Sequence, residues 1–271
     1  MALYCLKNPM INNDWGCPKS MVNLFGFSNP DNLPLAELWM GAHPKAPSSI
    51  ILDVAKTRPL DEYISQNPKQ YLGDECAEKF SNKLSFLFKV LSAQSPLSIQ
   101  SHPNKEQAIE GWKKENEARI PLHAYNRNYK DDNHKPELVY AITEFHALNG
   151  FREYSQIYEL FTLVQSSYLK EKLETFARSM NSEGLKEFYY ALMTNPQPTN
   201  LVLEIIENIS ERLEKNLDPK PLENLWKLII SIHNKYPGDV GVLSPLLINY
   251  VVLQPGEAMF LEAGTLHAYL K

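Results

Sequence analysis

Two short segments of the sequence carry side chains that commonly bind divalent metal ions. Gln100 and His102 alternate with other residues in one segment, and Lys135 and Glu137 are spaced in the same way in the other. Because alternate side chains of an extended strand lie on one face, each pair is expected to point in one direction. His267 supplies a second imidazole. An amide, two imidazoles and a carboxylate suit zinc or a similar divalent ion, with room left for water or a substrate.

An ordinary structural role has to be weighed for each of these residues. A solitary His or Gln is more often a hydrogen-bonded core or surface group than a metal ligand. Gln100 and His102, however, share a strand face, and Glu137 follows a proline that stiffens the approach. His267 follows Gly264, which allows a tight entry into a strand. Since Glu137 and His267 are far apart in the sequence, spacing alone gives only weak support for a shared site.

Longer motifs connect these segments. They are residues 13–16, 36–44, 98–103, 133–137 and 263–269. In this order, along nearly the whole chain, they resemble the type I mannose-6-phosphate isomerases, also called phosphomannose isomerases. The resemblance implies that Gln100, His102, Glu137 and His267 hold one catalytic Zn²⁺ per chain. It also implies a place in carbohydrate and mannose metabolism, including GDP-mannose biosynthesis.

The resemblance implies an isomerase that interconverts mannose 6-phosphate and fructose 6-phosphate by moving a proton between adjacent carbons through an enediolate. The metal would stabilise the negative oxygen, and a base must reach the carbon-bound proton. Lys135 is the candidate base, because it shares a strand face with Glu137 and would lie near the cation. The cation would lower the pKa of Lys135 towards neutrality, and the carboxylate would oppose that change. A salt bridge to Glu137 or a contact with the substrate phosphate is an equally good interpretation of Lys135.

Further residues are expected to contact the substrate. Ser98 shares the face of the ligands, and Lys105 is close enough in the sequence to stand at the rim. Trp15 and Glu37 lie in motifs that the family places at its active site. Trp15 or Tyr269 could pack on the apolar face of the sugar, and Lys105 could neutralise its phosphate. Core packing is the alternative role for Trp15, and a solvated surface charge is the alternative for Lys105.

Composition limits the possible classes of function. The chain has 271 residues, of which 44% are hydrophobic, and a net charge of -5. It can therefore bury a substantial core and hold one large domain or two smaller ones. The sequence has no dense run of Lys and Arg, which disfavours nucleic acid and anionic membranes as partners. Three cysteines without metal-ligand spacing favour reduced thiols in a cytoplasmic protein, and no apolar run is long enough to span a bilayer.

The chain changes character twice along its length. Residues 1–151 have Pro, Gly and Asn turns between short apolar runs, which predicts strands and loops with one helix over 77–92. Residues 152–236 have helical periodicity interrupted by prolines, and strand signals return in 237–271. We therefore predict a mixed α and β protein. Residues 1–151 and 237–271 would form a cupin-like β-barrel or jelly roll, as in the family, and 152–236 an inserted all-helical subdomain.

The last residues of the sequence bear on activity and assembly. The sequence ends at Lys271, whereas the family continues with an acidic residue and an arginine that are thought to act on the substrate. The β domain is thus expected to be truncated, and a catalytically impaired sugar-phosphate or metal-binding module, or a fragment, is the alternative function. A monomer is expected, with an open strand edge beside Tyr269 where a second chain could pair. Two His and one carboxylate also occur in iron oxygenases, but Gln100 and the family motifs argue against that class.

Overall fold

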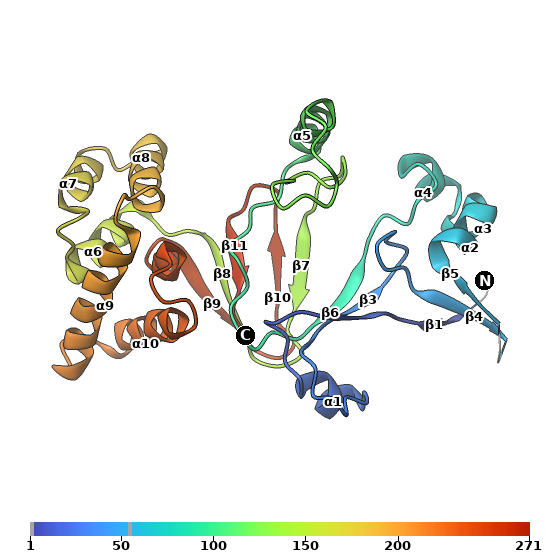
Figure 1. Cartoon of the computed structure of the whole chain (residues 1–271), viewed down its shortest axis with the longest axis horizontal. Coiled ribbons are helices and arrows are strands. Elements are labelled where there is room, and N and C mark those ends of the chain that lie inside the picture. Colours follow the sequence, from blue (N-terminus) through green and yellow to red (C-terminus); the bar gives the residue numbers. More distant parts are fainter. Residues whose placement is uncertain (1–2, 54–55) are drawn as a thin grey trace. The chain divides into compact units, whose positions relative to one another are not determined.

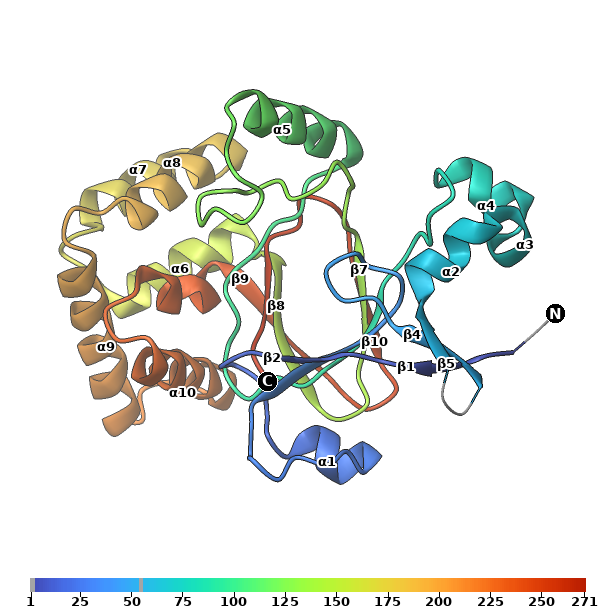
Figure 2. The same ribbon diagram turned by 45° about the vertical axis from the view of Figure 1, so that its right-hand side comes forward.

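The computed structural model describes residues 3–53 and 56–271 of the chain. These residues form both helices and strands (Figures 1 and 2), which confirms the predicted mixed α and β class. The chain divides into two compact units, Met1–Ser95 with Lys271 and Pro96–Leu270. The separation of residues 152–236 as an inserted subdomain stays a prediction. Within the described ranges, no helix combines the length and the apolar character needed to cross a membrane.

The first unit is built on antiparallel sheets. One has the order β1 (Cys5–Lys7), β4 (Ser49–Asp53) and β5 (Lys56–Pro59), and another has the order β2 (Met10–Asn12), β3 (Leu35–Met40) and β6 (Phe88–Leu91). The unit also contains the short helices α1 (Ser20–Phe25), α2 (Leu60–Gln66), α3 (Pro68–Leu72) and α4 (Asp74–Lys79). Met21, Leu35 and Leu38 pack together in a small core. Gly16 lies against the backbone of Ala36, where a Cβ would come within 2.7 Å of the amide nitrogen, so the motif at 13–16 has a steric reason for its glycine.

The helix predicted over residues 77–92 is wrong. Helix α4 ends at Lys79, and Ser81 and Asn82 take positive φ angles of 51° and 62°. The amide of Asn82 bonds to the carbonyl of Ala77 at 2.7 Å, which closes the helix with a left-handed turn. The chain then extends into β6, which pairs with β3. The apolar residues that follow α4 therefore lie in a turn, a loop and the strand β6.

In the second unit, β11 (His267–Tyr269) is paired along both of its edges. β7 (Glu137–Tyr140) pairs with β10 (Ala258–Leu261), and β8 (Phe145–Phe151) lies between β9 (Ile248–Leu253) and β11. On the other edge of β11, Gln100 and His267 exchange backbone hydrogen bonds of 2.8 and 2.9 Å, and the amide of Leu97 bonds to the carbonyl of Tyr269 at 2.8 Å. The open edge predicted beside Tyr269 is therefore wrong, because the segment before Gln100 folds back along β11.

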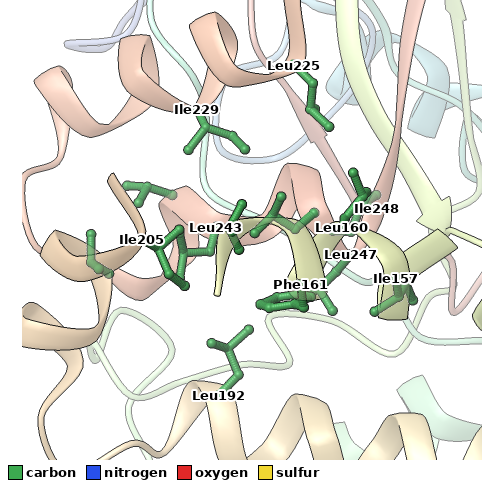
Figure 3. Close-up of a cluster of buried hydrophobic side chains, with 14 of the residues drawn as sticks. Ile157, Leu160, Phe161, Leu192, Ile205, Leu225, Ile229, Leu243, Leu247 and Ile248 are labelled. Atoms are coloured by element: carbon green, nitrogen blue, oxygen red, sulfur yellow. The ribbon is translucent and has the colours of Figure 1, made fainter. Parts of the chain in front are cut away.

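Helices complete the second unit. They are α5 (Lys105–Glu117), α6 (Tyr154–Val164), α7 (Lys170–Arg178), α8 (Ser182–Met193), α9 (Pro198–Glu214), α10 (Lys220–Lys235) and the 3-10 helix η1 (Val240–Leu246). The apolar faces of α6 to α10 form a large core in which Phe161 and Trp226 are fully buried (Figure 3). Leu148 of β8, Ile248 of β9 and Ala268 of β11 belong to the same core. The helices thus hold the strands that carry part of the site described below.

An ion pair fixes the connection between α9 and α10. Nε and Nη2 of Arg212 donate to the two carboxylate oxygens of Asp218 at 2.8 and 2.6 Å, and Nε1 of Trp226 donates to Oδ2 at 2.8 Å. The hydrogen bonds from Arg212, opposed by burial, lower the pKa of Asp218. Because the bidentate pair also anchors a fully buried tryptophan, it joins the turn between the helices to their core.

Replacing this carboxylate should destabilise the fold in a pH-dependent manner. Asp218→Asn is expected to lower the free energy of unfolding by about 1–3 kcal/mol at neutral pH, since it removes the charge opposite Arg212. The lowered pKa means that this stabilisation is present above the ordinary Asp pKa of about 3.9 and is lost as the pH falls through the lower folded-state value.

Urea unfolding curves at pH 7 and pH 3 would check this prediction. The difference between the natural protein and Asp218→Asn should shrink at pH 3. Glu183→Gln removes an exposed partner of Lys186 and serves as the control, with no measurable change expected at either pH. A difference of the same size at both pH values would contradict the role given to the charge of Asp218.

Candidate metal centre

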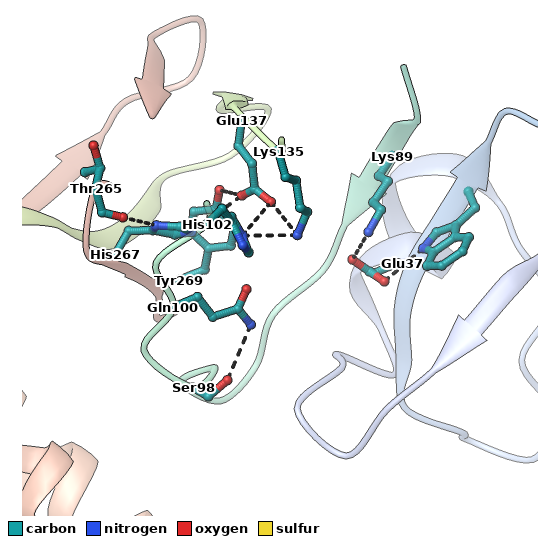
Figure 4. Close-up of polar contacts among 11 residues, drawn as sticks. Glu37, Lys89, Ser98, Gln100, His102, Lys135, Glu137, Thr265, His267 and Tyr269 are labelled. Carbon is teal, nitrogen blue, oxygen red and sulfur yellow. Dashed lines mark hydrogen bonds and ion pairs between the residues drawn. The ribbon is translucent and has the colours of Figure 1, made fainter. Parts of the chain in front are cut away.

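Three side chains of the second unit converge in the manner of a metal site. His102, Glu137 and His267 each offer one ligand atom, and these atoms lie within 4.8 Å of one another (Figure 4). Glu137 begins β7 and His267 begins β11, while His102 follows the segment that pairs with β11. Segments that are remote in the sequence therefore meet at one point, as the sequence analysis expected of these residues.

Strand alternation explains how His267 reaches this point. Ala268 and Leu270 of the same segment pack in the helical core, so His267 and Tyr269 project from the opposite face. Gly264 has a φ of 84° and donates its amide to the carbonyl of His102 at 2.7 Å. A glycine takes this left-handed conformation without strain, and the turn brings the chain into β11 beside His102.

The hydrogen bonding of His267 favours the neutral tautomer in which Nε2 can bind a metal ion. Its Nδ1 lies 2.8 Å from the carbonyl oxygen of Thr265, and because a carbonyl only accepts, Nδ1 carries the proton. Its Nε2 faces Oε2 of Glu137 at 3.7 Å. Burial lowers the pKa of His267, an effect opposed by the Thr265 carbonyl and the charge of Glu137. The unprotonated Nε2 is the form of histidine that binds metal ions.

Glu137 is held as a carboxylate at the middle of the group. Burial would raise the pKa of Glu137, but contacts with His102, with the ammonium of Lys135 and with the hydroxyl of Tyr269 hold it well below its usual range. Nε2 of His102 lies 3.3 Å from Oε1 of Glu137, and the rings of His102 and His267 are 5.1 Å apart between centroids. Two imidazoles and one ionised carboxylate are the donor set of many catalytic zinc sites.

Lys135 lies where the sequence analysis placed it, next to Glu137. Its Nζ is 2.8 Å from Oε1 of Glu137 and 3.1 Å from Nε2 of His102. The side chain of Lys135 is 52% exposed, whereas that of Glu137 is 19% exposed. The amine is therefore accessible to a small molecule while it remains in contact with the metal-binding group. This arrangement is compatible with each of the roles considered for Lys135, namely the base, the salt bridge to Glu137 and a contact with the substrate phosphate.

Gln100 and Ser98 lie together on the segment that pairs with β11. The backbone bonds between Gln100 and His267 hold the amide side chain close to the cluster of His102, Glu137 and His267. Figure 4 shows the amide oxygen turned towards this cluster. Nε2 of Gln100 lies 3.4 Å from Oγ of Ser98. The hydroxyl of Ser98 thus lies at the amide nitrogen, and the role of the Gln100 oxygen as a fourth donor stays a prediction.

Lys105 and Tyr269 make contacts that the sequence analysis did not foresee. Nζ of Lys105 donates to the carbonyl of Asp132 at 2.7 Å and to Oδ1 of Asn133 at 3.1 Å. Lys105 therefore binds the segment that leads into Lys135. Tyr269 is only 8% exposed, and its hydroxyl donates to Oε2 of Glu137 at 2.5 Å. No spacing signal in the sequence connects either pair, because each joins segments far apart in the chain.

Trp15 and Glu37 belong to the first unit, and their predicted roles at a substrate site stay predictions. The carbonyl of Trp15 accepts from the amides of Gln94 and Ser95. Glu37 accepts from Nε1 of Trp39 at 2.9 Å and pairs with Lys89 at 3.0 Å. Lys89 was not singled out from the sequence, since only the register of β3 with β6 brings it across from Trp39.

Comparison with known proteins places this site in a family. Residues 3–154 match the family model described as phosphomannose isomerase type I, catalytic domain. The mannose-6-phosphate isomerases of Salmonella typhimurium and Escherichia coli are 44% and 43% identical to the chain over 266 residues. These matches cover 98% of this chain and 66% of each relative, so the chain spans slightly less than two thirds of their length.

Solved structures agree with the sequence matches. A crystal structure of mannose 6-phosphate isomerase from Salmonella typhimurium, bound to substrate (fructose 6-phosphate) and zinc, has a TM-score of 0.88 at 42% identity. The match covers 100% of this chain and 66% of that one. A zinc-bound mannose 6-phosphate isomerase structure matches with the same TM-score and identity over 99% of the chain. The predicted cupin-like fold class is confirmed, because these are cupin-fold enzymes. The chain belongs to the type I phosphomannose isomerases.

Proposed function

We propose that this protein is a zinc-dependent aldose–ketose isomerase that interconverts mannose 6-phosphate and fructose 6-phosphate. The observation that carries the proposal is the convergence of His102, Glu137 and His267 from remote segments. The second support is the family. The mannose-6-phosphate isomerases of Salmonella typhimurium and Escherichia coli are 44% and 43% identical to this chain, over 98% of its length.

The residues present fit a divalent ion such as Zn²⁺. His102 and His267 would supply nitrogen donors and Glu137 a carboxylate oxygen, and three such ligands are typical of catalytic zinc. Gln100 would add an amide oxygen. When bound, the ion would supply Lewis acidity that stabilises negative charge developing on a substrate oxygen. The carbonyl of Thr265, through its bond to Nδ1, would fix the His267 tautomer that this role needs.

Lys135 is the residue that we propose moves the proton. In the direction from aldose to ketose, the C–H bond at carbon 2 breaks, a C–H bond forms at carbon 1, and a hydroxyl proton passes from the oxygen on carbon 2 to that on carbon 1. As a free amine, Lys135 would accept the carbon-bound proton and then return it. Its contact with Glu137 would hold the amine beside the substrate. Since the side chain is half exposed, a sugar phosphate could reach it.

The free cysteines bear on the cellular compartment, and the pairing of β11 bears on the oligomeric state. Cys5, Cys17 and Cys76 are free thiols, which supports a reducing compartment such as the cytoplasm. Both edges of β11 are paired, so the edge considered for dimer formation is not open, and we propose a monomer.

An activity assay on the Zn²⁺-loaded protein tests the proposed function. Fructose 6-phosphate should form from mannose 6-phosphate in a coupled assay, and removal of the metal with a chelator should abolish product formation. Metal analysis should find one zinc ion per chain. Binding of zinc and sugar phosphate without product would instead favour the metal-binding module, and stoichiometric iron with oxygen consumption would indicate an oxygenase.

Removal of the amine of Lys135 should separate proton transfer from metal binding. Lys135→Met is expected to lower the exchange of the carbon-bound hydrogen of the substrate with solvent by about 10²–10⁴-fold, the usual contribution of a general base. Zinc content should be unchanged. Lys113→Met, at an exposed position of α5, is the control and should retain full exchange. Exchange at the natural rate in Lys135→Met would remove Lys135 from the role of base.

Loss of one imidazole should release the metal. His102→Ala is expected to weaken Zn²⁺ binding by more than about 100-fold, because even outer partners of metal ligands contribute about 10–100-fold. His123→Ala, which changes an exposed histidine, should bind Zn²⁺ as the natural protein does. Competition with a chromophoric chelator would measure both affinities. Equal affinity in the two variants would show that His102 is not a ligand.

A further inference from the structure

Residues 265–269 orient two of the three converging donors. The carbonyl of Thr265 accepts from Nδ1 of His267 at 2.8 Å, and the hydroxyl of Tyr269 donates to Oε2 of Glu137 at 2.5 Å (Figure 4). The first contact is local, whereas the second crosses to a strand 132 residues earlier in the chain. One short segment thus supplies one donor and holds another.

The two oxygens of Glu137 have different partners. Oε1 faces Nζ of Lys135 at 2.8 Å and Nε2 of His102 at 3.3 Å, while Oε2 receives the hydroxyl of Tyr269. A carboxylate turns readily about its last bond, because that torsion is broad. A donor fixed on one oxygen removes this freedom and sets the direction of the other oxygen. The hydrogen bond to a charged acceptor is also among the stronger ones in proteins.

Tyr269 is itself held firmly. Its backbone is paired on both sides, with Ala147 of β8 and with Leu97. Its ring contacts the ring of Phe145 at 5.5 Å and that of His267 at 5.7 Å between centroids. The scaffold, rather than a bound molecule, therefore determines where this hydroxyl lies.

These contacts leave little of Tyr269 for a substrate. The residue is 8% exposed, and its hydroxyl is already engaged. The rings of Phe145 and His267 also lie against that of Tyr269, which limits the ring surface left for packing on a sugar.

We propose that Tyr269 is a positioning residue that orients the carboxylate of Glu137 for metal binding. The inference rests on the proposed metal centre but concerns affinity and coordination geometry rather than turnover. Outer partners of metal ligands commonly change metal affinity by about 10–100-fold. Loss of the hydroxyl should therefore weaken metal binding by a factor in this range, and it should alter the geometry of the site.

Tyr250→Phe provides a matched control for Tyr269→Phe. Tyr250 is a partly buried tyrosine of the same unit, and its hydroxyl is also bonded to a side chain, Nδ1 of His146. Each variant deletes one hydroxyl and one hydrogen bond, but only Tyr269 contacts Glu137. A difference between the two variants in metal binding cannot then come from the general cost of losing a tyrosine hydroxyl.

The experiment measures Zn²⁺ affinity by chelator competition, the visible absorption of the Co²⁺-substituted protein, and the urea unfolding of the metal-free protein. In Tyr269→Phe we expect affinity to fall by about 10–100-fold and the Co²⁺ spectrum to change. In Tyr250→Phe both should stay as in the natural protein, even if its metal-free form unfolds at lower urea. In a Glu137→Ala background, Tyr269→Phe should cause no further loss of affinity, because the carboxylate that it orients is gone.

Equal affinity and an unchanged Co²⁺ spectrum in Tyr269→Phe would overturn the inference, as would an equal further loss in the Glu137→Ala background. Failure of the unaltered protein to bind either metal would overturn both this inference and the proposed metal centre. Tight metal binding that depends on Tyr269, in a protein that forms no fructose 6-phosphate, would support the positioning role and refute the proposed isomerase alone.

Discussion

The pairing of residues 97–100 with β11 is the constraint on which the site depends. Backbone hydrogen bonds between Gln100 and His267 fix the register, and that register sets which side chains face the carboxylate of Glu137. On the reverse face of the strand, Ala268 packs into the core of helices α6 to α10. Burial of apolar surface on that face therefore contributes directly to the position of the His267 imidazole, because a slip of one residue would exchange the two faces of β11.

The electrostatics of the group follow from placing one carboxylate in a largely buried position. An isolated charge there would be costly, and Glu137 is stabilised by the ammonium of Lys135 and the hydroxyl of Tyr269. The same contacts lower the pKa of Glu137, while burial lowers that of His267. Both shifts favour the forms that bind a cation, an ionised carboxylate and a neutral imidazole. The folded chain thus favours the metal-binding protonation states of Glu137 and His267.

Local patterns in the sequence predicted which side chains would share a strand face, but they did not predict contacts between distant segments. Lys135 and Glu137 do form an ion pair, although Lys135 precedes β7, which begins at Glu137, so the shared strand face expected from alternation is not what brings them together. The prediction of a helix over 77–92 was wrong, because apolar spacing does not reveal the left-handed turn at Ser81 and Asn82. The bond from Tyr269 to Glu137 depends on the approach of β11 to β7, which no spacing encodes. The family resemblance, rather than periodicity, joined Glu137 to the histidines.

Helix α5 explains why the segments bearing His102 and Glu137 can hold a fixed geometry although both follow loops. Asn104, two residues after His102, begins the helix with reciprocal hydrogen bonds to Gln107, so the end of the His102 segment is capped firmly. The next residue, Lys105, donates to the carbonyl of Asp132 and to the side chain of Asn133, just before Lys135. The first turn of α5 therefore joins the two segments through one side chain. For Lys105 the sequence left open a phosphate contact or a solvated surface charge, and in the structure its side chain connects the segment that bears His102 to the one that bears Glu137.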